Sequence, residues 1–177
     1  MRVPLKLRCL ILLVLASCSS TPERHTYTLS PAQGGAPARS VLVAEVRVSA
    51  PTYLNFAGIA LASGAHEFTY AAHHEWVEPL EEGVQRALRR QLERVGVPED
   101  VERIDVSLER FHGEIDGTVM LEAIWQARRP SSDRQHAAVR FRAVETSLGQ
   151  GYGHMVEAHH RLLERLAEEI ASTLGAS

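Results

Sequence analysis

Nine histidines are the residues that most readily suggest chemistry in this 177-residue chain. His73 and His74 are adjacent, and His154, His159 and His160 lie close together near the C-terminus. Neither group has zinc-protease spacing, and a carboxylate-bridged metal site would need ligands from further helices, which so short a chain does not supply. We therefore expect no metal site and no cofactor, and the roles of these histidines stay open.

The remaining reactive side chains are few. Lys6 is the only lysine, and the two cysteines, Cys9 and Cys18, both lie close to the N-terminus. A Schiff base, a P-loop lysine and a thiolate metal cluster therefore have no residues to form them in the main part of the chain. The sequence predicts that the protein is not an enzyme. The alternative is that the protein is an enzyme, namely a hydrolase of the cell envelope that uses Glu75, Glu78 or the histidines.

The first 17 residues have the pattern of a signal peptide. Arg2, Lys6 and Arg8 accompany an apolar run over residues 9–16, which is far shorter than the roughly 20 residues that a membrane-spanning helix needs. Loss of this leader changes the net charge from −3 to −6 because three basic residues leave with it. An acidic chain is a poor ligand for nucleic acid, so we expect no nucleic-acid partner.

The end of the leader resembles the bacterial lipobox. Leu15, Ala16 and Ser17 precede Cys18, and small residues before a cysteine are the pattern that signal peptidase II cleaves. This resemblance implies a mature chain that starts at Cys18 and carries covalent diacylglycerol and an N-acyl chain, such as palmitate, on that residue. Ser19 in the next position favours the outer membrane, with the protein on its periplasmic face. Three acyl chains exceed what stable anchoring requires.

The rest of the chain predicts a tether and one domain. Residues 18–40 are rich in Ser, Pro, Gly and Ala, which is typical of a flexible tether, and residues 41–177 form the domain. Apolar residues recur with helical spacing over 77–95 and 155–174, and they alternate with polar ones over 104–108, 119–125 and 139–143. A strand over 41–48 precedes these elements, and further short strands are expected over 27–29, inside the tether, and over 66–70. We expect an α+β, two-layer sandwich, with a mostly antiparallel sheet and both amphipathic helices on one face.

One segment has no charged side chain. Residues 48–65 contain neither acids nor bases, and they include large apolar groups. This pattern fits one or two buried strands, or a surface that meets lipid or another subunit. We expect Tyr53, Leu54, Phe56 and Trp76 to contact a partner or lipid, with core packing as the alternative for each.

Several short elements, in order, resemble the family of ABC-type transport auxiliary lipoproteins, to which paraquat-inducible protein C belongs. They are Tyr27, Thr28 and Leu29; Pro51, Tyr53 and Leu54; Trp76, Glu78, Pro79 and Leu80; Leu88 and Leu92; Arg110 and Phe111; and Leu121, Ala123 and Trp125. The resemblance implies a periplasmic α+β domain anchored in the outer membrane, without enzymatic activity. It also implies MCE-domain transport proteins as partners, phospholipid as a further contact, and compatibility with a ring-shaped homo-oligomer.

The combined prediction is a non-catalytic, membrane-anchored lipoprotein subunit of an MCE-type, ABC-type intermembrane lipid transport system. Its sites are lipidation at Cys18 and contact through the four residues named above. Two alternatives stay open. One is a structural lipoprotein of outer-membrane assembly, and the other is the envelope hydrolase. The identity of the lipid and the direction of its transport do not follow from the sequence.

Overall fold

The computed structural model describes residues 22–30, 44–130 and 137–175. In this part of the chain, seven strands and two α-helices occur, together with a short 3-10 turn. In chain order these are β1 (His25–Tyr27), β2 (Glu45–Ser49), η1 (Thr52–Leu54), β3 (Gly58–Gly64), β4 (Glu67–Trp76), α2 (Leu80–Val95), β5 (Arg103–Glu114), β6 (Thr118–Arg128), β7 (Val139–Thr146) and α3 (Tyr152–Gly175). The two predicted helices and the three alternating strands are thereby confirmed.

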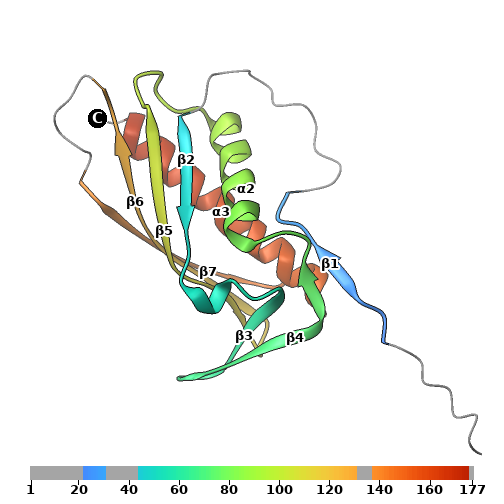
Figure 1. Ribbon diagram of the computed structural model, residues 1–177. Coiled ribbons are helices and arrows are strands. Elements are labelled where there is room, and N and C mark those ends of the chain that lie inside the picture. Colours follow the sequence, from blue (N-terminus) through green and yellow to red (C-terminus); the bar gives the residue numbers. More distant parts are fainter. Residues whose placement is uncertain (1–21, 31–43, 131–136, 176–177) are drawn as a thin grey trace, which may run out of the picture.

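All seven strands belong to one sheet (Figure 1). The order across it is β1-β4-β3-β5-β6-β7, and β2 pairs with the first part of β5. The pairs β3–β4, β5–β6 and β6–β7 are antiparallel, and the last two form a meander of β5, β6 and β7. The pairs β1–β4, β2–β5 and β3–β5 are parallel. The sheet is therefore mixed. Each parallel pair joins two strands that are not consecutive in the sequence.

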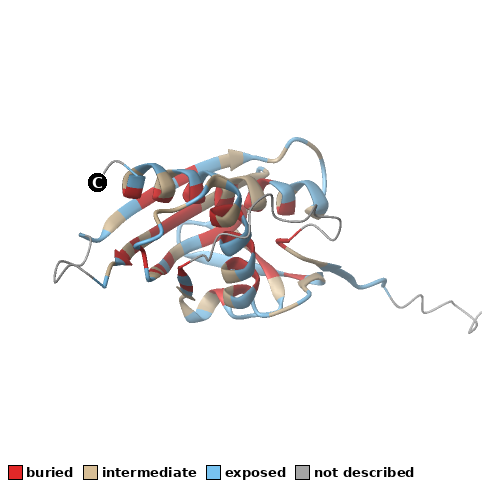
Figure 2. Ribbon diagram, turned by 90° about the horizontal axis from the view of Figure 1, so that it is seen from above, coloured by how far each residue is buried: buried red, intermediate tan, exposed pale blue. Residues whose placement is uncertain are grey.

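Both helices cover the same face of the sheet. Helix α3 packs against β5, β6 and β7, and α2 packs against α3 and β2. Figure 2 shows that the buried residues lie on the sides of the helices and strands that face one another. This arrangement confirms the predicted α+β fold with two layers.

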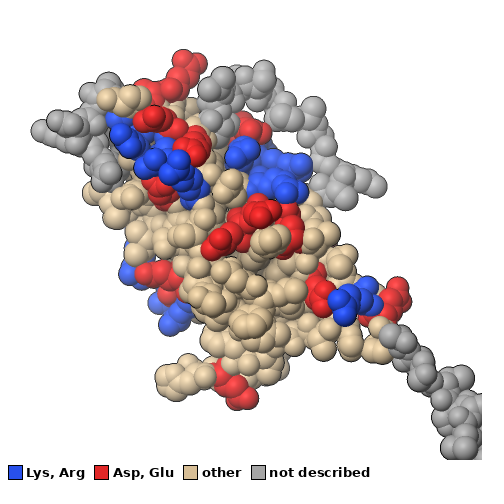
Figure 3. All heavy atoms as spheres, viewed as in Figure 1, with Lys and Arg blue, Asp and Glu red and all other residues tan. Residues whose placement is uncertain are grey.

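The other face of the sheet has no helix among the described residues, and we call it the helix-free face. Over β5, β6 and β7 it carries ion pairs. Arg140 pairs with Glu109, and Arg142 lies 3.0 Å from Glu122. Over η1, β3 and β4 the surface is different, because Figure 3 shows a broad area there without Lys, Arg, Asp or Glu.

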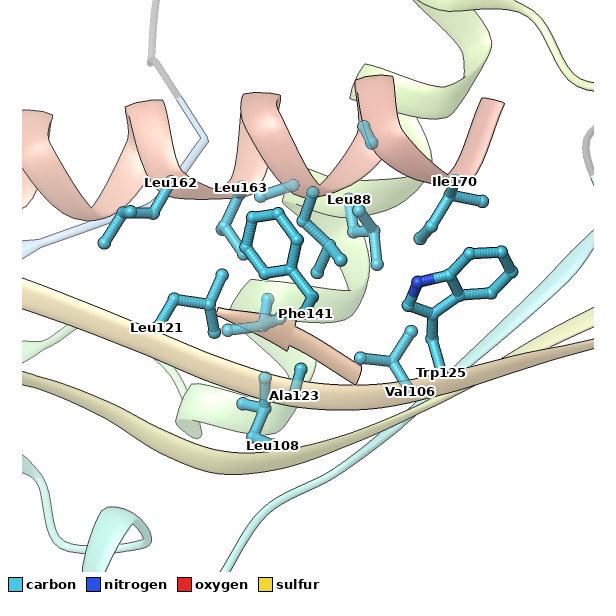
Figure 4. Close-up of a cluster of buried hydrophobic side chains, with 14 of the residues drawn as sticks. Leu88, Val106, Leu108, Leu121, Ala123, Trp125, Phe141, Leu162, Leu163 and Ile170 are labelled. Atoms are coloured by element: carbon cyan, nitrogen blue, oxygen red, sulfur yellow. The ribbon is translucent and has the colours of Figure 1, made fainter. Parts of the chain in front are cut away.

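The main core lies between the sheet and the two helices (Figure 4). Its largest fully buried side chains come from both layers: Trp125, Phe111, Ile104, Leu121, Leu88, Leu92, Leu162, Leu163, Leu166, Ile170 and Leu174. Each such side chain stabilises the fold by about 1.5–3 kcal/mol relative to its exposed state. The periodic apolar residues of the sequence thus form one continuous core that fixes the helices against the sheet.

A bulge in β5 lets side chains from both halves of that strand point into the core. The pairing of β5 with β6 shifts between Leu108 and Arg110. An extra residue in one strand reverses the alternation of its side chains. As a result Leu108 and Phe111, three positions apart, both lie in the core, each no more than 3% exposed.

The short strand expected over 27–29, inside the predicted tether, lies two residues earlier. His25–Tyr27 forms β1, which pairs in parallel with β4. Leu29, just after it, is 2% exposed and belongs to the main core. The short strand is stabilised by this long-range pairing, which its own composition does not indicate. The predicted signal peptide and Cys18 lie outside the described residues.

The ends of α2 follow from two residues. Pro79 stands just before the helix, where no amide donor is needed, so the helix begins at Leu80 and not at residue 77 as predicted. Gly96 ends it with a φ of 84°, a conformation that favours glycine. Within the described ranges, neither helix is long and apolar enough to cross a membrane.

Candidate interaction surface

Four aromatic side chains gather on the helix-free face at β3 and β4. We call them the aromatic patch: Tyr53, Phe56, Phe68 and Tyr70. The side-chain directions in β5 show on which face of the sheet the patch lies. A Cβ on Gly113 would meet the sulfur of Met155 in α3, so the preceding residue, His112, points to the opposite face. The Phe68 ring meets the His112 ring edge-on at 4.9 Å, which places the patch away from α3.

The aromatic patch is exposed and carries no basic residue. Phe56 is 56% exposed, and Phe68 and Tyr70 are each 37% exposed. The ring centroids of Phe56 and Tyr70 are 4.7 Å apart, and those of Tyr53 and Phe68 are 4.8 Å apart. No Lys or Arg occurs in residues 48–85. A contiguous exposed apolar surface of this kind is typical of a contact with protein or lipid.

Hydrogen bonds hold the patch in place. The Tyr70 hydroxyl donates to the Tyr53 carbonyl oxygen at 3.0 Å, and the Tyr53 hydroxyl lies 3.2 Å from Nδ1 of His112. Burial raises the pKa of Tyr53 and lowers the pKa of His112. Both side chains are therefore neutral at pH 7, and the charged groups beside them, Arg110 and Glu122, are paired with each other at 3.6 Å.

The four residues predicted to make contacts fall into two groups. Tyr53 and Phe56 belong to the aromatic patch. Leu54, at the end of η1, is 2% exposed and packs in the main core, so its side chain is not available to a partner. Trp76 is half-buried and packs against both hydrophobic clusters, as its core alternative predicts. The contact predicted through Leu54 is thus wrong, because η1 turns that side chain inward.

Sequence reasoning missed two members of the patch, Phe68 and Tyr70. Both lie on β4, two residues apart, so that they share one face. Their alternation with Thr69 was the available signal, since the region 66–70 was expected to be a strand. What the sequence did not indicate is that this face meets η1.

His159 is a buried histidine on the apolar side of α3. It is 1% exposed, and its Nδ1 lies 2.9 Å from the Met155 carbonyl oxygen one turn earlier. The rings of Phe111 and Trp76 meet it edge-on at 4.7 and 5.6 Å. Burial lowers its pKa to about 4, so the ring is neutral at pH 7. Nδ1 therefore donates to Met155, and the ring packs as part of the core.

Other histidines connect segments of the fold. His74 lies 2.9 Å from the Tyr27 hydroxyl of β1 and stacks on Tyr152 of α3 at 3.9 Å. His160 of α3 lies 2.9 Å from the carbonyl oxygen of Leu29. These contacts link the first strand to α3. Among the described residues, no group of His, Cys, Asp and Glu could hold a metal ion.

The two acids of the hydrolase alternative have basic partners. Glu78 forms an ion pair with Arg86 of α2, and Glu75 lies 3.3 Å from Arg24, just before β1. Glu78 is the less exposed of the two, and the Cβ position of Gly83 lies against its side chain. Both carboxylates thus take part in contacts that hold the start of α2 and the first strand.

Comparison with known proteins adds to this geometry. A family model described as the ABC-type transport auxiliary lipoprotein component matches residues 27–171. A search of curated proteins finds no match. One solved structure, described as an uncharacterized protein, has a TM-score of 0.71 and 19% identity, and the alignment covers 86% of this chain and 99% of that one. A Xanthomonas campestris protein of the DUF330 family has a TM-score of 0.61 and 17% identity, over 86% of this chain and 92% of that one. These two structures show the same fold.

Proposed function

Because this chain belongs to the family of ABC-type transport auxiliary lipoprotein components, we propose that it is a non-catalytic, lipid-anchored subunit of an intermembrane lipid transport system. Its partner in this proposal is an MCE-domain transport protein. Its place is the periplasmic face of the outer membrane, where acyl chains on Cys18 hold it. The family match over nearly the whole domain is the observation that carries the proposal.

The anchor determines how strong the partner contact has to be. A domain fixed to one membrane meets its partner at a high effective concentration, so a small surface of modest affinity is enough. The aromatic patch is such a surface. It is exposed and uncharged, and rigid aromatic rings lose little conformational entropy on binding.

The chemistry of the patch indicates what it would bind. Residues 48–85, which include Phe56, Phe68 and Tyr70, contain no Lys or Arg. The cation beside the patch, Arg110 of β5, is already paired with Glu122 at 3.6 Å, so a phosphate group or an acidic peptide would have to compete with that pair. An apolar segment of a protein fits better, because its side chains could pack between the exposed rings. We therefore assign the patch to the MCE-domain partner and not to the charged part of a phospholipid.

Copurification tests this proposal. The full-length protein, made with its own leader, is solubilised from membranes in mild detergent, and the proteins that accompany it are identified by mass spectrometry. We expect an MCE-domain protein. Recovery of the outer-membrane assembly machinery instead, without any MCE-domain protein, would favour the structural alternative and contradict the proposal. Turnover of peptidoglycan or phospholipid by the purified protein would contradict its non-catalytic part.

Two variants make the test specific to the patch. Phe56→Ser removes the most exposed ring, and we expect it to reduce the recovered partner at least fivefold. Val144→Ser is the matched control, since Val144 is 43% exposed but lies on β7, at the other edge of the sheet. It should leave the recovery unchanged. An equal loss in both variants, or in neither, would show that the aromatic patch is not the contact.

A further inference from the structure

The direction of the strands shows which end of the sheet the preceding chain approaches. β1 is parallel to β4, and β4 is antiparallel to β3. The N-terminal end of β1 therefore points in the same direction as the C-terminal end of β3. β3 is in turn parallel to β5, so the β3–β4 turn and the β5–β6 turn lie at that same end (Figure 1). The N-terminal end of β1 thus lies toward the turns and not toward the opposite end of the sheet, although residues 22–24 diverge from β4 (Figure 1).

A third loop, which follows β7, lies beside these two turns. The Ser147 amide, just after β7, donates to the Gly117 carbonyl oxygen in the β5–β6 turn at 2.9 Å. We call the three segments together the turn end: residues 64–67, 114–117 and 147–151. A shallow depression of about 270 Å³ lies at this end, with Leu61 and Met155 in its lining.

The turn end exposes two aliphatic side chains. Leu148 is 81% exposed and Ile115 is 71% exposed, more than any other exposed large hydrophobic side chain of the described residues. They lie on neighbouring loops, on either side of the Ser147–Gly117 hydrogen bond. Neither residue contributes to the core, so folding does not explain them.

The charges of the turn end have one sign. Glu67, Glu114 and Asp116 lie in it, and no Lys or Arg occurs in residues 111–127 or 143–160. The nearest cation, Arg161, donates to the Thr146 carbonyl oxygen at 3.1 Å and is paired with Glu145. The excess of carboxylates at this end repels anionic lipid headgroups, whereas it is compatible with zwitterionic headgroups that carry an ammonium group.

The chain that leads to Cys18 is about as long as the overhang of the sheet. His25 is paired with His74, and Glu67, at the turn end, is seven residues earlier on the same strand. β4 bulges between its pairings with Gly58 and Ala60, so the overhang is measured along β3, where the six residues from Gly58 to Gly64 extend about 20 Å at about 3.3 Å per residue. Cys18 is also seven residues before His25, and seven residues span at most about 25 Å. The seven residues are therefore long enough for the turn end to reach a membrane that holds Cys18.

We propose that the turn end rests on the lipid surface in which Cys18 is anchored, and that Ile115 and Leu148 enter the headgroup region of a leaflet of zwitterionic phospholipid. This inference rests on the proposed function, because it requires an acylated Cys18. The second contact gives the anchored domain one orientation. The opposite end of the sheet, with the α2–β5 connection, then faces away from the membrane.

Site-specific fluorescence tests the orientation. In the mature, acylated protein Cys18 is blocked and Cys9 has been removed with the leader, so an introduced cysteine is the single free thiol. The variants Ile115→Cys and Leu148→Cys carry an environment-sensitive dye, and Glu99→Cys, an exposed position between α2 and β5, is the matched control. The proteins are reconstituted into phosphatidylethanolamine-rich vesicles that contain a lipid with a nitroxide quencher.

We expect at least threefold more quenching at positions 115 and 148 than at position 99, and a clear decrease when phosphatidylglycerol replaces most of the zwitterionic lipid. Equal quenching at all three positions would overturn the proposed orientation. A second measurement excludes an effect of the dye itself. With the dye on Ala65→Cys in the β3–β4 turn, replacing both Ile115 and Leu148 by serine should lower the quenching at least twofold. No change there would also overturn the proposal.

Flotation of the same vesicles separates this inference from the function on which it rests. If the acylated protein floats with the vesicles but positions 115 and 148 are quenched no more than position 99, the anchor stands and only the orientation is wrong. If the protein made with its own leader does not float, the anchoring itself is refuted, and the orientation is refuted with it.

Discussion

Replacing His159 by leucine should make the free energy of unfolding less sensitive to acid. Burial lowers the pKa of this histidine from 6.5 to about 4. Between these two pH values the unfolded chain, whose histidines have ordinary pKa values, binds more protons than the folded chain. The stability is therefore complete above about pH 6.5 and is lost as the pH falls toward 4. His112, whose pKa is also lowered by burial, acts in the same direction.

The size of the effect follows from the two pKa values of His159. One pKa unit corresponds to about 1.4 kcal/mol, so the loss at about pH 4 approaches roughly 3 kcal/mol. At pH 5 the loss is about 2 kcal/mol, whereas at pH 7 it is about 0.2 kcal/mol. Exposed carboxylates titrate mainly below this range. A comparison of pH 7 with pH 5 therefore reports chiefly on the buried histidines.

Urea-induced unfolding at the two pH values measures this difference. The fluorescence of Trp76 and Trp125 follows the core, and circular dichroism provides a second probe because Trp76 touches the replaced ring. We expect the wild-type protein to lose about 2 kcal/mol and the His159→Leu protein at least about 1 kcal/mol less. His154→Leu, the same change at an exposed position of α3, should retain the wild-type loss. If His159→Leu lost as much stability as the wild type, the assignment of the acid sensitivity to this ring would be refuted.

Three further substitutions test the geometry, each by urea unfolding at pH 7. Gly58→Ala should lower the free energy of unfolding by about 1–3 kcal/mol, because its Cβ would lie 2.8 Å from the Ala71 carbonyl oxygen. Gly64→Ala, where a Cβ has room, should lower it by less than about 0.5 kcal/mol. Similar values for the two variants would contradict the β3–β4 pairing. Leu54→Ala should cost about 2–5 kcal/mol and Phe56→Ala less than about 1 kcal/mol, and the reverse order would contradict the assignment of Leu54 to the core and Phe56 to the surface. Gly96→Ala should cost about 1–3 kcal/mol because of its positive φ, and an unchanged stability would be evidence against that helix end.

The sequence predicted the elements whose apolar residues are periodic over many positions. The helices α2 and α3 and the alternating strands β5, β6 and β7 are of this kind, since each buries one face against the same core. The first strand was predicted only approximately, over 27–29 and inside a tether, because its three residues form no periodic pattern of their own. Its position depends on pairing with β4, about fifty residues later, and pairing at that distance leaves no local signal.

The candidate surface was predicted only in part, for two local reasons. Leu54 and Phe56 are similar in the sequence, and only the 3-10 turn between β2 and β3 makes one buried and the other exposed. His112 was missed because the bulge at Leu108 and Arg110 reverses the alternation of β5 and brings this histidine beneath Tyr53. Neither a single turn nor a bulge leaves a periodic pattern that could be detected beforehand.

The mass of the protein isolated from its own membranes tests the proposed anchoring most directly. We expect a chain that begins at Cys18, is heavier than its amino acids by three acyl chains and glycerol, and fractionates with the outer membrane. The Cys18→Ser protein should lack this added mass and leave the membrane fraction. A wild-type chain with an unmodified Cys18, or a Cys18→Ser chain that remained in the outer membrane, would contradict an anchored subunit.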